Sequence, residues 1–323
     1  MRDVILSSTG WVVERSKHVK IKEGNVSTLL DKYVDRLGKK HPEEKELFPF
    51  LQDNELAEWL FVVEILNHCF WPDPGKPRWE IEYKGKWYSG YWALEASLLR
   101  ALQQYRMPVH KAEFLAGLNT EDLKNIFSGR GEIPLFKERL ENLKEAGEIL
   151  LERWEGSITN VIEEAGGSAL KLVELLKDNF WSFKDEAKYL GNKVYFYKRA
   201  QIFPADLHAK LGGKSWGRFR DVNMLTAFAD YKLPQVLRHL GIMEYDSYLA
   251  GKIDSFQFLT AGSEEEIEIR AATIQACELI RRKAQTEKGL QLTSLDVDQW
   301  LWSLGQENAF RRYPYHRTRT IYY

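Results

Sequence analysis

The sequence predicts a mainly α-helical protein that folds as a single domain with one small β-hairpin. Apolar residues recur at helical spacing through most of the 323 residues. One short segment alternates with period two instead, and no Pro-, Ser- or Gly-rich linker and no internal repeat divides the chain. The predicted domain therefore covers residues 1–323.

Helical spacing identifies the individual predicted helices. The apolar stripe expected over 55–70 contains Leu56, Leu60 and Val63, followed by Asn67. A helix over 264–283 has Ser263 and Glu266 at the spacing of a capping box. The other predicted helices cover 91–104, 120–127, 135–151, 169–176, 194–211, 222–228, 233–240 and 295–304.

Period-two alternation predicts the hairpin. It runs through 78–83 and again through 86–88, and Lys84 and Gly85 between these stretches supply a turn. The chain is also rich in rings, with 11 Trp, 15 Tyr and 16 Phe. This supply suits both a large core and a ligand pocket lined with ring faces.

Composition argues against several classes of protein. Lys and Arg number 46 and Asp and Glu 47, whereas proteins that bind a polymer of phosphates usually carry a basic excess. A polymeric nucleic acid is therefore not an expected partner. No apolar run approaches the roughly 20 residues that span a bilayer, and the N-terminal residues lack the order of a signal peptide. A cytoplasmic protein with no membrane contact, acting as a monomer, is expected.

The usual motifs of metal and cofactor sites are absent from the sequence. The seven histidines show no HExxH spacing, and Cys69 and Cys277 are too few for a structural zinc site. Gly212-Gly213-Lys214-Ser215 is similar to the end of a phosphate-binding loop, but the first glycine of that pattern would fall at His208. No cofactor and no metal are expected.

The most informative segment is 228–235, which places Asp230 just before a helix that has Pro234 in its first turn. Backbone N–H groups at a helix start hold a carboxylate and favour its charged form. Two interpretations stay open at this point. Asp230 caps the helix and nothing more, or it acts on a small aromatic anion that the neighbouring rings and Lys232 bind.

Three further segments combine rings with polar groups. Residues 67–71 close a helix, and a helix end sealed by core aromatics is the structural alternative to a binding site. Residues 195–201 fit an amphipathic helix whose cations extend to solvent. The tail, 311–323, interleaves four arginines and one histidine with four tyrosines. Because disordered tails are usually poor in aromatics, docking of this tail onto the body is expected.

Together these segments resemble the queuosine salvage protein family. The matching pieces are 66–71, 88–90, 198–201, 228–235 and 315–319. Family members often carry Arg-Val where this chain has Lys232-Leu233, so the positive charge and an aliphatic residue are kept. The resemblance implies a helical fold similar to helix-hairpin-helix DNA glycosylases, adapted to a free nucleotide. It also implies hydrolysis of queuosine 5′-monophosphate to queuine and ribose 5-phosphate for salvage into tRNA modification, with Asp230 as the catalytic carboxylate.

The implied reaction explains why a carboxylate is needed. Breaking an N-glycosidic bond builds positive charge at C1′ of the ribose, and an ionised carboxylate nearby stabilises it, either electrostatically or by a transient covalent bond. Asp230 must then be ionised, so its pKa is expected to be ordinary or lowered by helix N–H groups and Lys232. Queuine is a 7-deazaguanine, so the departing base needs hydrogen bonds to its pyrimidine edge instead of protonation at that position.

The remaining assignments follow from the resemblance and from charge. We expect Asn67 and His68 at the base edge, Phe70, Trp71 and Phe228 at the ring faces, and Glu95 at the cationic amine. Glu95 as a plain surface residue is the alternative. Lys198, Tyr231 and Lys232, with His316 and Arg317 from the tail, are expected at the phosphate. Two rival functions stay open: a glycosidase of another nucleotide or of damaged DNA, and a non-catalytic helical protein that binds a modified base or nucleotide.

Overall fold

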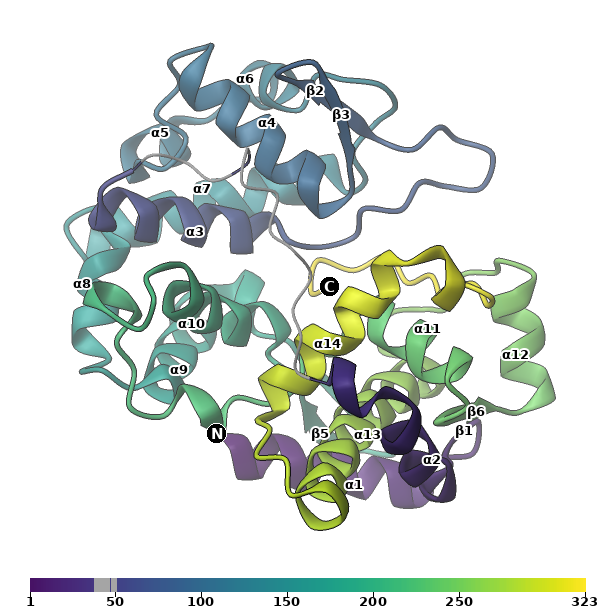
Figure 1. The fold of residues 1–323 in the computed structure, drawn as a ribbon. Coiled ribbons are helices and arrows are strands. Elements are labelled where there is room, and N and C mark those ends of the chain that lie inside the picture. The colour runs from purple at the N-terminus through teal and green to yellow at the C-terminus, as the bar shows by residue number, and fades with distance from the viewer. Residues whose placement is uncertain (38–46, 48–50) are drawn as a thin grey trace. The chain divides into compact units, whose positions relative to one another are not determined.

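The computed structural model describes residues 1–37, 47 and 51–323, and this part of the chain is mainly helical, as predicted (Figure 1). The helices are α1 (Arg2–Arg15), α2 (Glu23–Tyr33), α3 (Asp53–Leu66), α4 (Tyr91–Gln103), α5 (Ala112–Gly117), α6 (Thr120–Ile126), α7 (Phe136–Arg153), α8 (Ile158–Glu164), α9 (Ala169–Asn179), α10 (Lys198–Lys210), α11 (Lys232–His239), α12 (Ser247–Asp254), α13 (Glu264–Lys288) and α14 (Ser294–Gln306). Short 3₁₀ turns are η1 (Val34–Arg36), η3 (Trp181–Phe183), η4 (Ser215–Gly217), η5 (Val222–Met224) and η6 (Asn308–Phe310).

The strands form antiparallel pairs. They are β1 (Val19–Ile21), β2 (Glu80–Tyr83), β3 (Lys86–Ser89), β4 (Glu186–Tyr189), β5 (Asn192–Tyr195) and β6 (Met243–Tyr245). The predicted hairpin is confirmed as β2–β3, with Ile81 opposite Tyr88. The sequence reasoning missed the β4–β5 hairpin and the pairing of β1 with β6, in which Val19 lies opposite Tyr245.

The chain divides into two compact units, which are described separately. Among the described residues, the first unit contains 1–37, 185–201 and 221–319, and the second contains 47, 51–184, 202–220 and 320–323. Helix α10 begins in the first unit and continues into the second. A single domain over 1–323 stays a prediction.

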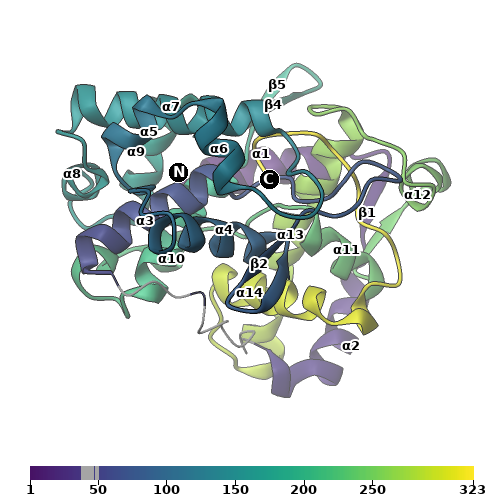
Figure 2. The same ribbon diagram turned by 90° about the horizontal axis from the view of Figure 1, so that it is seen from above.

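Helix α13 is the centre of the first unit, where α1, α2, α11 and α14 pack against it (Figure 2). Its apolar residues face the core at helical spacing, with Ile269, Ala272, Ala276 and Ile280 all buried. Ser263 Oγ accepts the N–H of Glu266, while the Glu266 carboxylate accepts the N–H of Gly262 rather than that of Ser263. Only half of the predicted capping box is therefore present.

Helix α3 is the most deeply buried helix segment of the second unit. Every residue of Leu56–Leu66 is buried, including Glu58 and Glu64. The predicted single apolar stripe is therefore wrong, because α4, α7 and α8 all pack against this helix. Helices α5 and α7 also pack closely. A Cβ at Gly147 in α7 would lie 2.4 Å from the backbone N of Ala116 in α5, so this position requires glycine. The β2–β3 hairpin lies along α4 (Figure 1).

Three predicted helices are wrong in part. The helix expected over 55–70 ends at Leu66, so residues 67–70 lie outside it. The helix expected over 194–211 begins only at Lys198, because Val194 pairs with Ala187 in the β4–β5 hairpin and Tyr197 has a φ of 50°. The helix expected over 222–228 is a single 3₁₀ turn followed by extended chain. Its N–H groups at Thr226 and Phe228 donate to side chains, so they make no helical bonds.

Candidate functional site

Asp230 lies in the first unit, where an extended segment enters α11. We call residues 226–233 the Asp230 segment. Oδ1 of Asp230 accepts hydrogen bonds from the backbone N–H groups of Lys232 and Leu233, at 2.8 and 2.9 Å. Pro234 follows directly and has no N–H to satisfy. The side chain is half-buried, and within the part of the chain that the structure describes no hydrogen bond reaches its Oδ2. The cap is therefore real, and it occupies only one of the two oxygens.

The pKa of Asp230 corrects the sequence-based expectation. Burial raises the pKa of this carboxyl above its ordinary value. The Lys198 ammonium, the N–H groups of Leu233 and Lys232, and the Lys232 ammonium oppose that rise without cancelling it. The expectation of an ordinary or lowered pKa is wrong because it counted the stabilising partners and omitted desolvation.

A second capping aspartate in the first unit provides a contrast. Oδ1 of Asp246 accepts the N–H of Leu249 at the start of α12, at 2.8 Å. Burial would raise the pKa of Asp246, but the bonds from Leu249 and from His18 lower it overall. The N–H bonds of a cap lower the pKa in both cases, and the greater desolvation of Asp230 accounts for its raised pKa.

Three elements hold the Asp230 segment. The Thr226 N–H donates to Gln201 Oε1 at 2.9 Å and the Phe228 N–H donates to Asp298 Oδ2 at 3.0 Å. Arg270 Nε donates to the carbonyl of Ala229 at 3.2 Å. The acceptors and donors come from α10, α14 and α13, so the backbone before Asp230 is bound from several sides. The sequence did not predict these contacts of Gln201, Asp298 and Arg270. The only sign of them in the sequence is that each is a polar residue in a predicted helix.

Lys198 is the first residue of α10 and is buried. Its N–H donates to Asp185 Oδ2 at 3.1 Å, and its ammonium acts on the pKa of Asp230. The preceding residue, Tyr197, has a φ of 50°, which is costly for a residue with a Cβ. The charges of Lys198 and Lys232 thus both act on Asp230, and the expected role of the two lysines at a phosphate stays a prediction.

The tail docks onto the first unit through residues 313–319, which confirms the expectation. The ring centroids of Tyr315 and Tyr231 are 5.0 Å apart, and Lys232 Nζ lies 5.4 Å from the Tyr315 centroid. Gln235 Nε2 donates to the Tyr313 carbonyl at 2.6 Å. These contacts place the tail beside α11.

The two tail residues expected at the phosphate differ in character. Burial, with a contribution from Arg270, lowers the pKa of His316 to about 3. His316 is therefore neutral at physiological pH and offers a hydrogen bond instead of a charge. The Arg317 carbonyl accepts the Leu259 N–H at 2.8 Å, and its guanidinium lies 4.8 Å from the Phe256 ring centroid.

In the second unit, residues 67–71 follow the end of α3, and we call them the α3 exit. Arg139, which is fully buried, donates to the carbonyls of Leu66, His68 and Cys69. The N–H of Cys69 donates to the carbonyl of Tyr323 at 2.9 Å. These bonds close the helix end through backbone groups, and both interpretations of the segment, a helix end sealed by core aromatics and a binding site, stay predictions.

The predicted base-binding residues of the α3 exit are mostly buried. His68, Phe70 and Trp71 are 1%, 6% and 2% exposed, and Asn67 Nδ2 donates to Glu64 at 3.1 Å. Their rings and polar groups lie on consecutive residues of one turn whose carbonyls Arg139 binds. Their role at a base stays a prediction.

Glu95 in α4 is buried, so the alternative of a plain surface residue is wrong. The Tyr91 hydroxyl donates to Glu95 Oε1 at 3.2 Å. Burial and then the carboxylates of Glu95, Asp206 and Glu64 raise the pKa of Tyr91 well above its usual value. Three carboxylates thus gather near one phenol. The sequence held one signal for them, since Glu64 interrupts an otherwise apolar run of α3.

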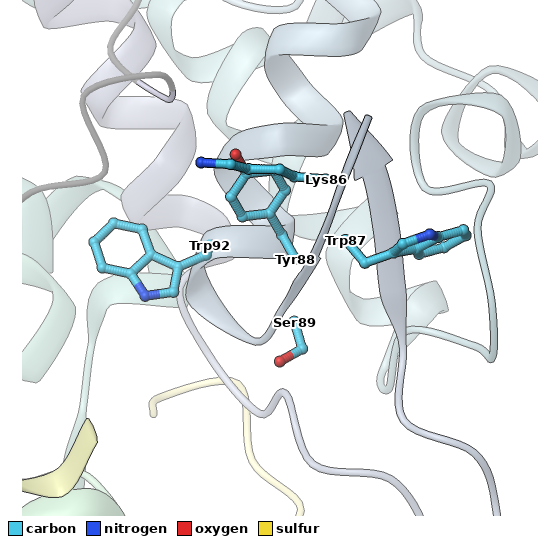
Figure 3. A pocket seen from close by; sticks show the side chains of 5 residues that line it. All are labelled: Lys86, Trp87, Tyr88, Ser89 and Trp92. Carbon is cyan, nitrogen blue, oxygen red and sulfur yellow. The ribbon is translucent and has the colours of Figure 1, made fainter. Parts of the chain in front are cut away.

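The second unit also contains a pocket of about 440 Å³ beside the β2–β3 hairpin (Figure 3). The rings of Trp87 and Trp92 lie on either side of Tyr88, and Arg130 covers the Trp87 ring at 3.7 Å. The lining residues are Lys86, Trp87, Tyr88, Ser89 and Trp92. None of the predicted site residues lines this pocket.

Two kinds of feature are absent from the described ranges, 1–37, 47 and 51–323. No cluster of three His, Cys, Asp or Glu side chains there is arranged to hold a metal ion. No helix in those ranges is long and apolar enough to cross a bilayer.

Comparisons with known proteins agree with the resemblance. A family profile described as "Queuosine salvage protein" matches residues 47–323. A relative from Sphaerobacter thermophilus is 44% identical over 319 residues, covering 99% of this chain and 97% of its own. A relative from Mus musculus is 39% identical over 86% of this chain and 85% of its own. Both relatives are named queuosine 5′-phosphate N-glycosylase/hydrolase.

Proposed function

The chain belongs to the queuosine salvage protein family, and we propose that it hydrolyses the N-glycosidic bond of queuosine 5′-monophosphate, releasing queuine and ribose 5-phosphate. The two relatives described above match 99% and 86% of this chain, and their names support this reaction. One structural observation carries it: Asp230 has one oxygen fixed by two backbone N–H groups and a second that no described group binds.

This geometry suits stabilisation of a cationic sugar. The bonds to Oδ1 orient the carboxylate, so Oδ2 needs little reorganisation when charge develops at C1′. Partial burial removes water that would otherwise screen the charge, and the raised pKa of Asp230 reports that desolvation. At neutral pH Lys198 and Lys232 favour the ionised form.

The two ammonium groups also give the phosphate a role in the chemical step. Two cations near Asp230 would oppose a positive charge at C1′. A bound phosphate carries about −1.5 to −2 charges at pH 7 and would neutralise them. Lys198 and Lys232 with Tyr231 are therefore proposed to bind the 5′-phosphate, with His316 and Arg317 as further candidates. The phosphate should then affect kcat as well as KM.

The residues proposed to bind the base have less structural support than Asp230. Asn67 and His68 at the base edge, with Phe70, Trp71 and Phe228 at its faces, stay proposals. Glu95 is proposed for the cationic amine, and its burial near Glu64 and Asp206 supports this because desolvated carboxylates attract a cation strongly. A monomeric, cytoplasmic enzyme that needs no cofactor and binds no polymeric nucleic acid is part of the same proposal.

The test is a direct search for released base. Purified protein is incubated with queuosine 5′-monophosphate, and queuine and ribose 5-phosphate are measured by mass spectrometry in equal amounts. Queuosine without its phosphate should be a much poorer substrate. Binding of the nucleotide without base release would identify a non-catalytic binding protein. Equal turnover of guanosine 5′-monophosphate or of a damaged duplex would identify a different glycosidase.

A further inference from the structure

We propose that Arg270 is a positioning residue that holds the start of α10, and with it Lys198, in a fixed place relative to the Asp230 carboxylate. This inference rests on the proposed function and extends it to a residue outside the predicted site. It concerns only the first unit, in which all the groups involved lie.

The guanidinium of Arg270 joins separate stretches of chain. Nη1 and Nη2 donate to Asp185 Oδ1 and Oδ2 at 2.8 and 2.6 Å, and Nε donates to the Ala229 carbonyl at 3.2 Å. Ala229 directly precedes Asp230. The planar fork of an arginine can make these bonds at once, whereas a lysine ammonium cannot reproduce their fixed directions.

Asp185 carries the connection onward to Lys198. Its Oδ2 accepts the Lys198 N–H at 3.1 Å, and its carbonyl accepts the N–H groups of Phe196 and Tyr197 at 3.1 and 3.3 Å. These bonds hold the left-handed turn at Tyr197 from which α10 starts. A displacement of Asp185 would therefore move the first turn of α10.

The burial of this pair favours positioning over stability as its role. Arg270 and Asp185 are both 2% exposed, and the Phe196 ring lies 3.9 Å from the guanidinium carbon. A buried ion pair costs desolvation energy and often adds little net stability compared with apolar residues of the same size. What this pair does add is a fixed distance between the chain at 185 and the chain at 229.

A matched control pair lies in the same unit. Arg238 in α11 and Asp254 in α12 also form a two-pronged ion pair, at 2.6 and 2.9 Å. Arg238 lies on the helix that Asp230 caps, and none of its contacts reaches Asp185, Lys198 or Ala229. Arg238→Gln is therefore the control for Arg270→Gln.

The experiment measures kcat and KM for queuosine 5′-monophosphate together with thermal unfolding. Arg270→Gln should lower kcat by about 10²-fold per folded enzyme, since a misplacement near 1 Å can cost that much. Arg270→Lys keeps the charge and should not restore kcat. Asp185→Asn nearly keeps the shape of the side chain and should give an intermediate loss of kcat. It replaces Arg270→Gln in the test if that variant folds poorly. Arg238→Gln should stay within about threefold of the unsubstituted enzyme.

A second measurement separates this inference from the proposed function. Amide hydrogen exchange of 196–199 and 228–233 needs no turnover and should accelerate in Arg270→Gln but not in Arg238→Gln. If the unsubstituted protein releases no base, the proposed function fails, and exchange alone decides the inference. If Arg270→Gln matches Arg238→Gln in kcat, or leaves the exchange of both stretches unchanged, Arg270 is not a positioning residue.

Discussion

The Asp230 segment and the α3 exit both lie at helix ends, and they use opposite charges. At the start of α11, the carboxylate of Asp230 accepts two backbone N–H groups. At the end of α3, the guanidinium of Arg139 binds backbone carbonyls. Each charge complements the helix dipole at its own end.

The side chains of Arg139 and Asp230 differ in how much of their hydrogen-bonding capacity the backbone uses. Arg139 is 0% exposed and donates to carbonyls at the α3 exit and also to that of Pro134, just before α7, at 2.8 Å. Asp230 is half-buried and uses one oxygen for the cap. The same local chemistry therefore serves structure at one helix end, and at the other it holds a group that can still act on a ligand.

The largest expected effect is the loss of turnover when the charge of Asp230 is removed. Asp230→Asn keeps an oxygen for the N–H groups of Lys232 and Leu233 but removes the negative charge. Turnover of queuosine 5′-monophosphate should fall by about 10³-fold, since loss of one preorganised electrostatic group has effects of this size. Nucleotide binding, measured by calorimetry, should persist.

Two controls accompany this substitution. Asp230→Ala should lose the same activity and about 1 kcal/mol of unfolding free energy, because the cap is also removed. Asp246→Asn makes the same chemical change at the cap of α12 and should leave kcat unchanged. Turnover of Asp230→Asn at the unsubstituted rate would show that Asp230 is a cap and nothing else.

The second effect is on stability and concerns Arg139. Arg139→Gln leaves several buried carbonyls unsatisfied, so the free energy of unfolding should fall by about 3 kcal/mol or more. Urea unfolding measures this loss. Arg153→Gln, on the exposed side of α7, should change stability by about 0.5 kcal/mol or less. Equal losses in the two variants would contradict a special role for Arg139.

The third effect is on the pH dependence of kcat. Because burial raises the pKa of Asp230, the acid limb of kcat should lie above the ordinary aspartate value of about 3.9. Lys232→Met removes a group that lowers this pKa and should shift the limb to higher pH. The measurement uses saturating nucleotide, since a phosphate itself titrates near pH 6. A limb at or below the ordinary value would contradict the raised pKa.

The raised pKa of Asp230 also makes the free energy of unfolding depend on pH. The folded-state pKa of Asp230 exceeds the unfolded value, so its favourable contribution is present at pH below the unfolded pKa and is lost as the pH rises through the folded pKa. Asp230→Asn does not titrate. Relative to the unsubstituted protein, it should therefore gain stability between pH 4 and pH 7, a comparison that urea unfolding at both pH values provides.

The smallest effect concerns the tail. Tyr315→Ala removes the ring contact with Tyr231 and the contact with Lys232, which together are worth about 1 kcal/mol. Thermal unfolding should detect this loss, and KM for the nucleotide should rise modestly while kcat changes little. Tyr248→Ala is the control for KM, because its ring makes contacts of the same kind with His18 and Lys252, away from the tail. An unchanged melting temperature would show that the docked tail adds no stability.

Local patterns in the sequence were enough for several features. Period-two alternation predicted β2–β3, and the position of Pro234 after Asp230 predicted that Asp230 binds the backbone N–H groups at the start of α11. Both are decided by neighbours within a few residues, where backbone bonding and side-chain periodicity act directly. The composition of the tail likewise predicted its docking.

Long-range contacts decided the features that the sequence reasoning missed or mistook. The stretch 222–228 has helical spacing, yet Gln201 and Asp298 bind its N–H groups and keep it extended. The pKa of Asp230 was expected in the wrong direction because burial depends on segments that are distant in the chain.

The amino-acid sequence by itself determined the helical class and the hairpin, since both depend on residue types at short spacing. Its resemblance to the family, carried by segments between 66 and 319, indicated the candidate carboxylate. Only the tertiary structure revealed that Arg270 and Asp185 connect Ala229 with Lys198, across separations of 41 and 85 residues from Arg270 along the chain. Such a connection leaves no periodic trace, because a buried polar side chain takes its partner from whatever backbone the fold brings to it.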